Sequence, residues 1–284
     1  MFYPSCLHTH SQFCDGKATM AQMAEKAADF GFVSLGFSSH SPLPYENDWA
    51  MREEAYPAYF AEIARLKELY KNKMEIYCGI EWDADTPRLP FLCSESSEQK
   101  HPPFDYVIGA VHSLVKNGEL FSVDYTKDLL LDVVHRLYGG DFWELCRDYY
   151  SAVVQSALRP EVDIVAHFDL ITKYNRGSNL FDERDSAYLD IAKEALERIL
   201  EKRPHLFFEI NTGVMARAGK EYPYPAPALL HILCENRVPL ILTGDCHRPE
   251  HFGVGYDFAR ELLLKERAPR LYLLSGGKFR KVAL

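Results

Sequence analysis

Short apolar runs alternate with longer amphipathic stretches along almost the whole chain. The apolar runs predict strands just before His8 and at 32–37, 74–82, 104–112, 162–167, 206–211, 238–247 and 270–274. The stretches between them carry apolar residues at helical spacing and predict helices at 20–30, 53–73, 126–158, 186–202, 226–235 and 257–266. Strands that alternate with helices pair in parallel through right-handed crossovers, so the pattern predicts an α/β fold.

Capping and loop signals mark where these elements begin and end. Thr19 is a candidate N-cap of the first helix, and Gly31 is placed to end it. The pair Gly139-Gly140 interrupts the 126–158 stretch, so we expect one long or two shorter helices there, with Asp141 as a cap. The stretch 83–103 contains four prolines and a polar run, and predicts a loop.

Length and composition favour one large domain. A chain of 284 residues with 47% apolar residues can bury a single core, and this length fits one barrel as well as two domains. Seven strand–helix units predict a distorted TIM-like (β/α)7 barrel that spans 1–284 as a single domain. In such a barrel the C-terminal ends of the strands meet on one face, which carries the chemistry of barrel enzymes.

Charge and hydropathy exclude several partners. Lys+Arg 32 against Asp+Glu 41 gives a net charge of -9, which argues against nucleic acid because a polyanion needs a basic track. No window approaches the roughly 20 apolar residues that span a bilayer, so we expect a soluble, cytoplasmic protein with no membrane partner. Seven cysteines without C-x-x-C spacing predict reduced thiols. The sequence gives no indication of the oligomeric state.

Side chains that bind metals follow one predicted strand after another. The first group is His8-Thr9-His10, in which residues two apart share a face, with Asp15 five residues later. The predicted strand ends that follow carry His40, Glu81, His112, His167, Glu209, Asn211, Asp245 and His247. All of these side chains are expected to gather at one rim of the barrel.

A metal centre explains this set better than separate structural roles do. Any single histidine here fits a core position about as well as a ligand position, but six of the eleven histidines share the same topological place. Crowded with three carboxylates, they would be poorly solvated and mutually repulsive without cations. Nitrogen and oxygen ligands with no thiolate requirement fit two or three Zn, Mn or Fe ions.

Several motifs, in this order, resemble those of the PHP (polymerase and histidinol phosphatase) family. They are His8-Thr-His10, His40-Ser-Pro-Leu-Pro44, Gly79-Ile-Glu81, Gly109-Ala-Val-His-Ser113, Ala166-His-Phe-Asp-Leu-Ile171 and Gly244-Asp-Cys-His247. The second and fifth resemble specifically the stand-alone histidinol-phosphate phosphatases. One departure is Ser38-Ser39 before His40, where relatives often carry an acidic residue. The resemblance covers nearly the whole chain and implies a (β/α)7 barrel with three divalent metal ions.

The resemblance also implies which residues hold each metal. One metal would take His8, His10, Glu81 and Asp245, a second Glu81, His112 and His167, and a third Asp15, His40 and His247. Glu81 would bridge two metals, and we expect Glu81, Asp245 and His247 to be the catalytic residues.

The implied reaction is hydrolysis of L-histidinol phosphate, a small phosphomonoester of histidine biosynthesis, to L-histidinol and phosphate. Enzymes accelerate such reactions up to about 10^21-fold, whereas one general acid or base supplies about 10^2 to 10^4. Metal ions supply much of the remainder by activating water and holding the phosphate oxygens, so we expect attack by a metal-bridging hydroxide. The general acid for the leaving group is not indicated by the sequence.

Candidate substrate contacts lie in the loops after the strands. Arg176 and Arg217 resemble phosphate-binding arginines of the family, and their planar forks match a phosphate, whereas Arg248 is a weaker candidate. A surface position is the alternative for each. Asp83, Asp85 and the 45–49 loop are candidates for the cationic imidazole end of the substrate, or form a solvated loop.

Three other functions are consistent with part of this pattern. A PHP-family phosphoesterase that acts on nucleotides or other phosphate esters would share the metal ligands. A metal-binding module without activity is the alternative from a different class. A thiol nucleophile at Cys6, Cys14 or Cys246 is disfavoured because no base is dedicated to any of them.

Overall fold

The computed structural model describes residues 4–86, 104–268 and 271–283, so most of the loop expected at 83–103 lies outside the described residues. A nine-stranded sheet has the order β1-β2-β3-β4-β7-β8-β9-β10-β11. Its strands are β1 (Ser5–Cys6), β2 (Ser34–Phe37), β3 (Glu75–Asp83), β4 (Tyr106–Ala110), β7 (Ile164–Val165), β8 (Phe207–Asn211), β9 (Leu240–Thr243), β10 (Leu271–Ser275) and β11 (Lys278–Val282). Neighbouring strands are parallel except β10 and β11, which are antiparallel.

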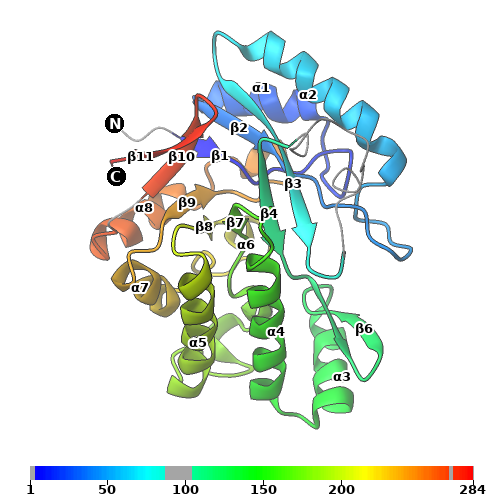
Figure 1. Ribbon diagram of the computed structural model, residues 1–284, viewed down its shortest axis with the longest axis vertical. Helices are drawn as coiled ribbons and strands as arrows, with labels where there is room; N and C mark the ends of the chain where they lie inside the picture. The colour runs from blue at the N-terminus through cyan, green and yellow to red at the C-terminus, as the bar shows by residue number, and fades with distance from the viewer. Residues whose placement is uncertain (1–3, 87–103, 269–270, 284) are drawn as a thin grey trace.

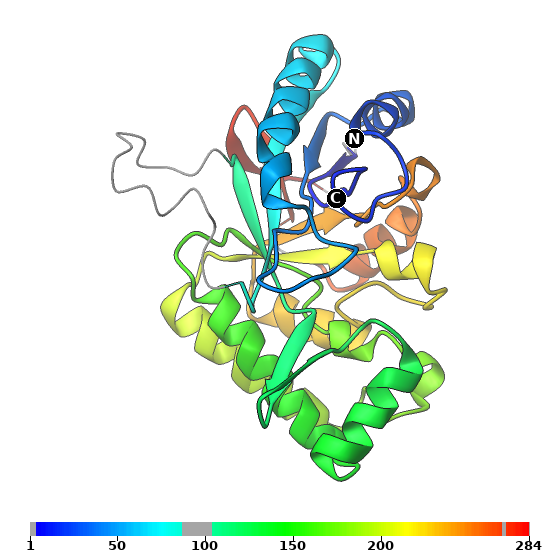
Figure 2. The ribbon, with the colours of Figure 1, turned by 90° about the vertical axis from the view of Figure 1, so that its right-hand side faces the viewer.

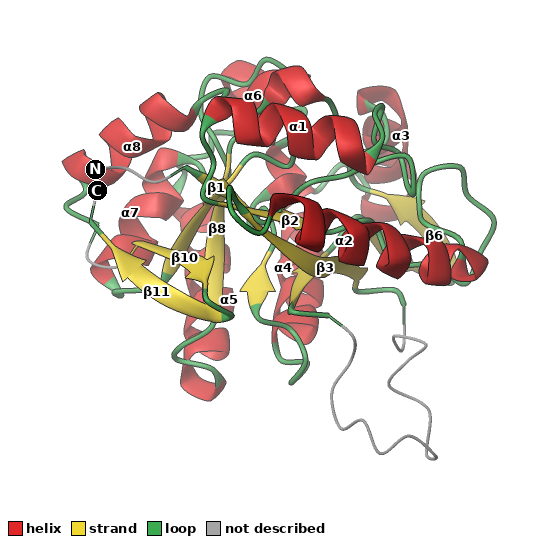
Figure 3. Ribbon diagram, turned by 90° about the horizontal axis from the view of Figure 1, so that it is seen from above, coloured by secondary structure: helices red, strands yellow, loops and turns green. Residues whose placement is uncertain are grey.

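The sheet curls until its first and seventh strands meet. Thr9 and Cys246, just beyond β1 and β9, form a parallel bridge in which the His10 N–H donates to the Cys246 carbonyl at 2.9 Å. The Cys246 N–H in turn donates to the His8 carbonyl at 3.1 Å. The ring of seven parallel strands therefore closes at its C-terminal end, and Figure 3 shows the curled strands with helices around them. This confirms the predicted distorted (β/α)7 barrel.

Helices cover the outside of the curled sheet. They are α1 (Met20–Phe30), α2 (Tyr56–Tyr70), α3 (Lys127–Tyr138), α4 (Phe142–Ala157), α5 (Ser186–Lys202), α6 (Gly213–Arg217), α7 (Pro227–Glu235) and α8 (Tyr256–Lys265). Short 3-10 turns occur at Glu53–Ala55, Leu170–Thr172, Arg176–Ser178 and Pro249–His251. Figure 1 shows α4 and α5 side by side below the sheet, with α1 and α2 above it. None of the helices in the described ranges has both the length and the apolar character needed to cross a bilayer.

The predicted helix boundaries agree with the structure because the capping residues act locally. The Thr19 hydroxyl accepts the N–H of Gln22, and the Gln22 side-chain oxygen accepts the backbone N–H of Thr19. Gly31 ends α1 in the left-handed conformation, and the Asp141 carboxylate accepts the first N–H groups of α4. Positive φ values at Gly139-Gly140 separate α3 from α4, so the 126–158 stretch forms two helices.

The sequence patterns above do not predict a two-stranded hairpin of β5 (Ser113–Lys116) and β6 (Glu119–Ser122). Its turn is Asn117-Gly118, with φ of 54° and 83°, which is a strong signal for a tight hairpin turn. Each strand has four residues and is only partly buried, so neither stands out by hydrophobicity. Figure 2 shows this hairpin in front of the helical layer formed by α3 and α4. Short α6 and the exposed edge strand β11 also lack a clear periodic signal.

Tyr106 fills the interior of the barrel beneath the site. It lies over Gly36 and Gly79, where an added Cβ would come within 2.1 and 2.2 Å of the tyrosine side chain. Its hydroxyl donates a hydrogen bond to the Leu7 carbonyl, directly before His8. The two glycines thus make room for a large side chain that ties β4 to the start of the site.

Candidate metal centre

The side chains expected at the strand ends do meet at one end of the barrel. His8, His10 and Asp15 follow β1, His40 follows β2, Glu81 lies within β3, His112 follows β4, His167 follows β7, and Asp245 and His247 follow β9. Parallel strands bring their C-terminal ends to the same edge, which is why residues far apart in the sequence share one site. Nearly all are buried, with Asp15 the most exposed at 29% of its side chain.

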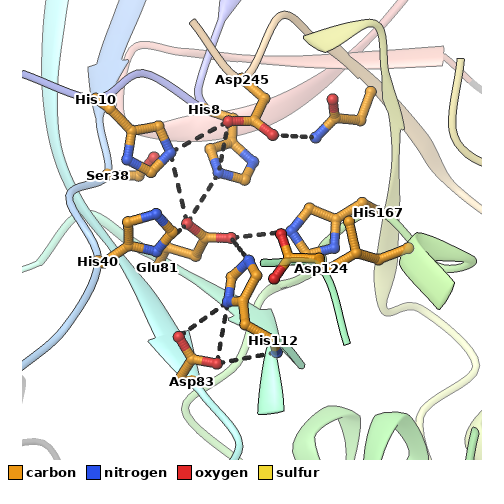
Figure 4. A network of polar contacts seen from close by, with 12 residues as sticks. His8, His10, Ser38, His40, Glu81, Asp83, His112, Asp124, His167 and Asp245 are labelled. Atoms are coloured by element: carbon orange, nitrogen blue, oxygen red, sulfur yellow. Dashed lines mark hydrogen bonds and ion pairs between the residues drawn. The ribbon is translucent and has the colours of Figure 1, made fainter. Parts of the chain in front are cut away.

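Glu81 lies at the centre of the group, and Figure 4 shows the imidazoles around it. One oxygen, Oε2, lies 2.8 Å from His40 Nδ1, 3.2 Å from His8 Nε2 and 3.5 Å from His10 Nε2. The other, Oε1, lies 3.1 Å from His167 Nε2 and 3.5 Å from His112 Nε2. A single carboxylate thus faces five imidazoles, which is the position that a bridging ligand requires.

Four groups of side chains could each hold a cation, because their ligand atoms lie within 4.8 Å of one another. The groups are His10, Asp15, His40 and His247; His8, His10 and Asp245; Glu81, His112 and His167; and His40, Asp83 and His112. The first three correspond closely to the ligand sets that the family resemblance implies, and the fourth adds Asp83.

The pattern of unused polar atoms fits cations at this site. His8 Nε2, His10 Nε2, His40 Nδ1, Glu81 Oε2 and Asp15 Oδ1 are buried and have no hydrogen-bond partner among the described residues. Leaving such atoms unpaired in the interior is costly, and a coordinated cation would satisfy their lone pairs. The donor set of imidazole nitrogens and carboxylate oxygens suits Zn, Fe or Mn.

Burial and neighbouring charges shift the pKa values within the group in opposite directions. Burial lowers the pKa of His10 to about 3, helped by His247 and His40, so its imidazole is neutral and its lone pair is available. Burial would raise the pKa of Glu81, but the facing histidines His40 and His8 hold it well below its usual range. Glu81 is therefore an ionised acceptor in the centre of the site.

Two further carboxylates orient the ligand rings. Asp83 accepts from His112 Nδ1 at 2.9 and 3.0 Å, and Glu209 accepts from His8 Nδ1 at 2.9 Å. Glu209 is itself fixed by Asn211 Nδ2 at 2.7 Å and Thr243 Oγ1 at 2.9 Å. Such contacts turn the Nε2 atoms of both histidines inward. Glu209 and Asn211 were expected at this rim, whereas Asp83 supports a histidine and does not face the substrate space.

The three arginines considered as phosphate contacts lie in different surroundings. Arg217, at the end of α6, donates to Asp245 at 2.6 and 3.0 Å and lines the cavity above the cluster. Arg176 is exposed and does not line that cavity; Lys173, three residues earlier, does. Arg248 is also exposed and lies 3.8 Å from Glu250. The geometry therefore supports a phosphate contact by Arg217 and gives none to the other two arginines.

The cysteines near the cluster have packing roles. Cys6 and Cys246 have no exposed surface, and the Sγ of Cys14 lies 3.4 Å from His10 Nδ1. None of the cysteines in the described ranges forms a disulfide. None of these three lines the cavity, which disfavours a thiol nucleophile.

The cavity has a volume of about 470 Å³, and part of its wall was not predicted. The expected 45–49 loop contributes Tyr45 and Trp49, and Trp49 packs edge-on against His40 with ring centroids 4.8 Å apart. The hairpin and the segment after it contribute Phe121 and Asp124. These two residues sit in a region without a strong sequence pattern, and the Asn117-Gly118 turn is the signal that indicates it.

Together the barrel and the buried cluster define an α/β barrel protein with a candidate multinuclear metal site at its C-terminal strand ends. A family model described as the PHP domain matches residues 7–213. The chain therefore belongs to the PHP domain family.

Similar proteins carry a consistent name. A protein of Deinococcus radiodurans named probable histidinol-phosphatase is 30% identical over 89% of this chain and 88% of its own length. A histidinol-phosphatase of Bacillus subtilis is 25% identical over 88% of this chain and 96% of its length. The crystal structure of histidinol phosphate phosphatase from Lactococcus lactis, complexed with Zn, L-histidinol and phosphate, matches with a TM-score of 0.69. At 22% identity and 98% coverage of both chains, that likeness supports the fold.

Proposed function

We propose that this protein is a metal-dependent phosphomonoesterase that hydrolyses L-histidinol phosphate to L-histidinol and phosphate. The observation that carries the proposal is Glu81, a buried carboxylate faced by five imidazoles. On its Oε2 side, the facing nitrogens of His8, His10 and His40 lack hydrogen-bond partners among the described residues. The substrate follows from the histidinol-phosphatases that resemble the chain over most of its length. In this proposal residues 1–284 act as one domain.

The proposed centre holds three divalent cations. The ligands are His8, His10, Glu81 and Asp245 for the first, Glu81, His112 and His167 for the second, and Asp15, His40 and His247 for the third. When bound, such cations supply an activated water and stabilise negative charge on the phosphate. The Zn of the Lactococcus lactis structure supports Zn as one of them.

The chain's own residues have separate tasks in the reaction. Glu209 and Asp83 hold the rings of His8 and His112 so that their Nε2 atoms point toward Glu81. Arg217, at the wall of the cavity, is positioned to hold the phosphate with its guanidinium. Its present contacts with Asp245 keep it oriented at that wall. Each of these contacts fixes the orientation of a side chain at the site, and correct orientation of reacting groups accounts for a large part of the catalysis of a bound ester.

Elemental analysis and a substrate panel test the proposal. The purified protein should contain Zn, Fe or Mn and release phosphate from L-histidinol phosphate faster than from nucleoside monophosphates or p-nitrophenyl phosphate. Glu81→Gln should abolish activity and lower metal content, whereas His231→Gln, at an exposed histidine away from the site, should change neither. A protein that binds none of these metals, or that prefers nucleotides, would contradict the assignment.

A further inference from the structure

One carboxylate in the cavity is left without a role in the proposed centre. The acidic residues that line the cavity are Asp15, Glu81, Asp124 and Asp245. Three of them belong to the proposed ligand sets, and Asp124 belongs to none of the candidate metal groups. Its side chain is 21% exposed, so it borders the cavity and is not part of the core.

Asp124 is held in a fixed position by the two segments that flank it. Its Oδ1 accepts from the Ser122 hydroxyl at 3.1 Å, and its Oδ2 accepts from Lys173 Nζ at 2.9 Å. Its backbone carbonyl accepts from Lys173 Nζ at 2.7 Å and from the Tyr174 hydroxyl at 2.6 Å. A carboxylate offers about four acceptor positions, so two bonds leave room for another donor. The ion pair with Lys173 keeps this carboxylate ionised at neutral pH.

Asp124 and Arg217 lie at different ends of the ligand cluster. The Asp124 carboxylate interacts electrostatically with His112 and His167. Asp245, the partner of Arg217, instead lies 3.2 Å from His10 Nε2 and 3.7 Å from His8 Nε2 (Figure 4). Arg217 and Asp124 line the same cavity, so a substrate whose phosphate contacts Arg217 has a carboxylate available to a second group. Tyr45, Trp49 and Phe121 line the same cavity and offer aromatic surface for a planar ring.

We propose that Asp124 binds the ammonium group of the substrate and selects phosphate esters of amino alcohols. This inference rests on the proposed function, because L-histidinol phosphate carries its ammonium on the carbon next to the ester carbon. Asp124 contacts the bound amine, Lys173 and Ser122 hold the carboxylate in place, and the aromatic side chains pack against the imidazole ring. Lys173 keeps its contacts when the amine binds, since the carboxylate has acceptor positions for both.

The test compares two esters that differ only in the amine. L-Histidinol phosphate and 3-(imidazol-4-yl)propyl phosphate are assayed with the metal-loaded enzyme. The wild-type protein should favour the aminated ester by about 10- to 100-fold in kcat/KM, the effect expected of a hydrogen bond to a charged group. Asp124→Asn should reduce that preference to within about twofold, mainly by raising KM for the aminated ester.

Two controls separate a specificity role from a structural one. Asp128→Asn makes the same chemical change at an exposed position on α3 and should retain the full preference. Metal content by elemental analysis should be equal in all three proteins. Retention of the preference in Asp124→Asn would overturn the assignment.

Measurements on the wild-type protein alone also test whether Asp124 binds the substrate amine. L-Histidinol should inhibit more strongly than 3-(imidazol-4-yl)propanol, by a similar factor. Equal kcat/KM for the two esters would overturn the role of Asp124 while leaving the phosphatase function intact. Failure to hydrolyse either ester would overturn the proposed function itself, and the Asp124 assignment with it.

Discussion

The carboxylate of Asp83 contacts His112 in three ways. It lies 2.9 and 3.0 Å from the ring Nδ1, and it accepts the backbone N–H of His112 at 3.2 Å. Asp83 ends β3 and His112 follows β4, so the pair joins two neighbouring strands of the barrel. Such a carboxylate fixes both the tautomer and the direction of a metal-binding imidazole.

Replacing Asp83 by Asn should weaken metal binding without unfolding the protein. Loss of an orienting carboxylate typically costs about 10- to 100-fold in metal affinity. Activity should fall accordingly and recover when excess Zn or Mn is added, as followed by phosphate release and metal titration. Asp85→Asn is the matched control, because Asp85 accepts a hydrogen bond from Tyr45 at 2.7 Å and belongs to none of the candidate metal groups among the described residues. Equal metal affinity in both variants would contradict the role of Asp83.

Arg217→Ala should raise KM for L-histidinol phosphate by about tenfold or more while metal content stays the same. In the proposed function the Arg217 guanidinium holds the phosphate at the cavity wall, and a charge-assisted hydrogen bond of this kind is worth about 1.5–3 kcal/mol. Arg176→Ala is the control, because that side chain is exposed and does not line the cavity. If Arg176→Ala had the larger effect on steady-state kinetics, the two assignments would have to be exchanged.

Removal of metal should abolish activity and lower thermal stability together. Without cations, the buried ligand atoms of Glu81, His8 and His10 lack hydrogen-bond partners among the described residues. A cation at 100 times its Kd contributes about 2.7 kcal/mol to the free energy of unfolding. Dialysis against a chelator followed by calorimetry should show the lower Tm, and added Zn should restore both Tm and activity. A Tm that does not change would argue against cations at this site.

Gly79→Ala should destabilise the barrel from within. The new Cβ would lie 2.2 Å from the Tyr106 ring, which is itself tied to Leu7 beneath the site. Overpacking of this kind costs about 1–3 kcal/mol. Urea unfolding should show a lower midpoint, and metal affinity should fall because His8 directly follows Leu7. An unchanged midpoint would mean that Tyr106 relaxes at little cost.

His231 provides a pH-dependent contribution outside the site. The hydrogen bond to Glu266, at 2.7 Å, raises the pKa of His231, and Glu235 adds to the effect. A histidine with a raised pKa stabilises the folded state fully below its unfolded pKa, about 6.5, and loses this effect as pH rises through the folded pKa. His231→Gln should therefore cost up to about 0.5 kcal/mol at pH 5.5 and almost nothing at pH 9, since the pair is exposed. Glu266→Gln should show the same pH dependence in urea unfolding.

Interactions between residues close together in the sequence explain which parts of the fold can be predicted from it. Thr19, Gly31 and Asp141 act within one turn of chain, so their capping roles are visible without the rest of the molecule. The alternation of strands and helices identifies a parallel barrel, and the topology then places every residue at a strand end on one face. The hairpin at 113–122 was not predicted because its short, partly buried strands carry little periodic signal, although Asn117-Gly118 indicates its turn.

Which side chains gather at the site can be inferred from the order of residues alone, because the end of a parallel strand is a fixed place in a barrel. Their partners become visible only in the folded chain: Asp83 supports His112, Arg217 and not Arg176 borders the cavity, and Asp124 lies beside the cluster. These choices depend on the direction of loops and on side-chain rotamers. Both are set by packing between segments that lie far apart in the sequence, such as Asp83 with His112 and Arg217 with Asp245, which no local pattern records.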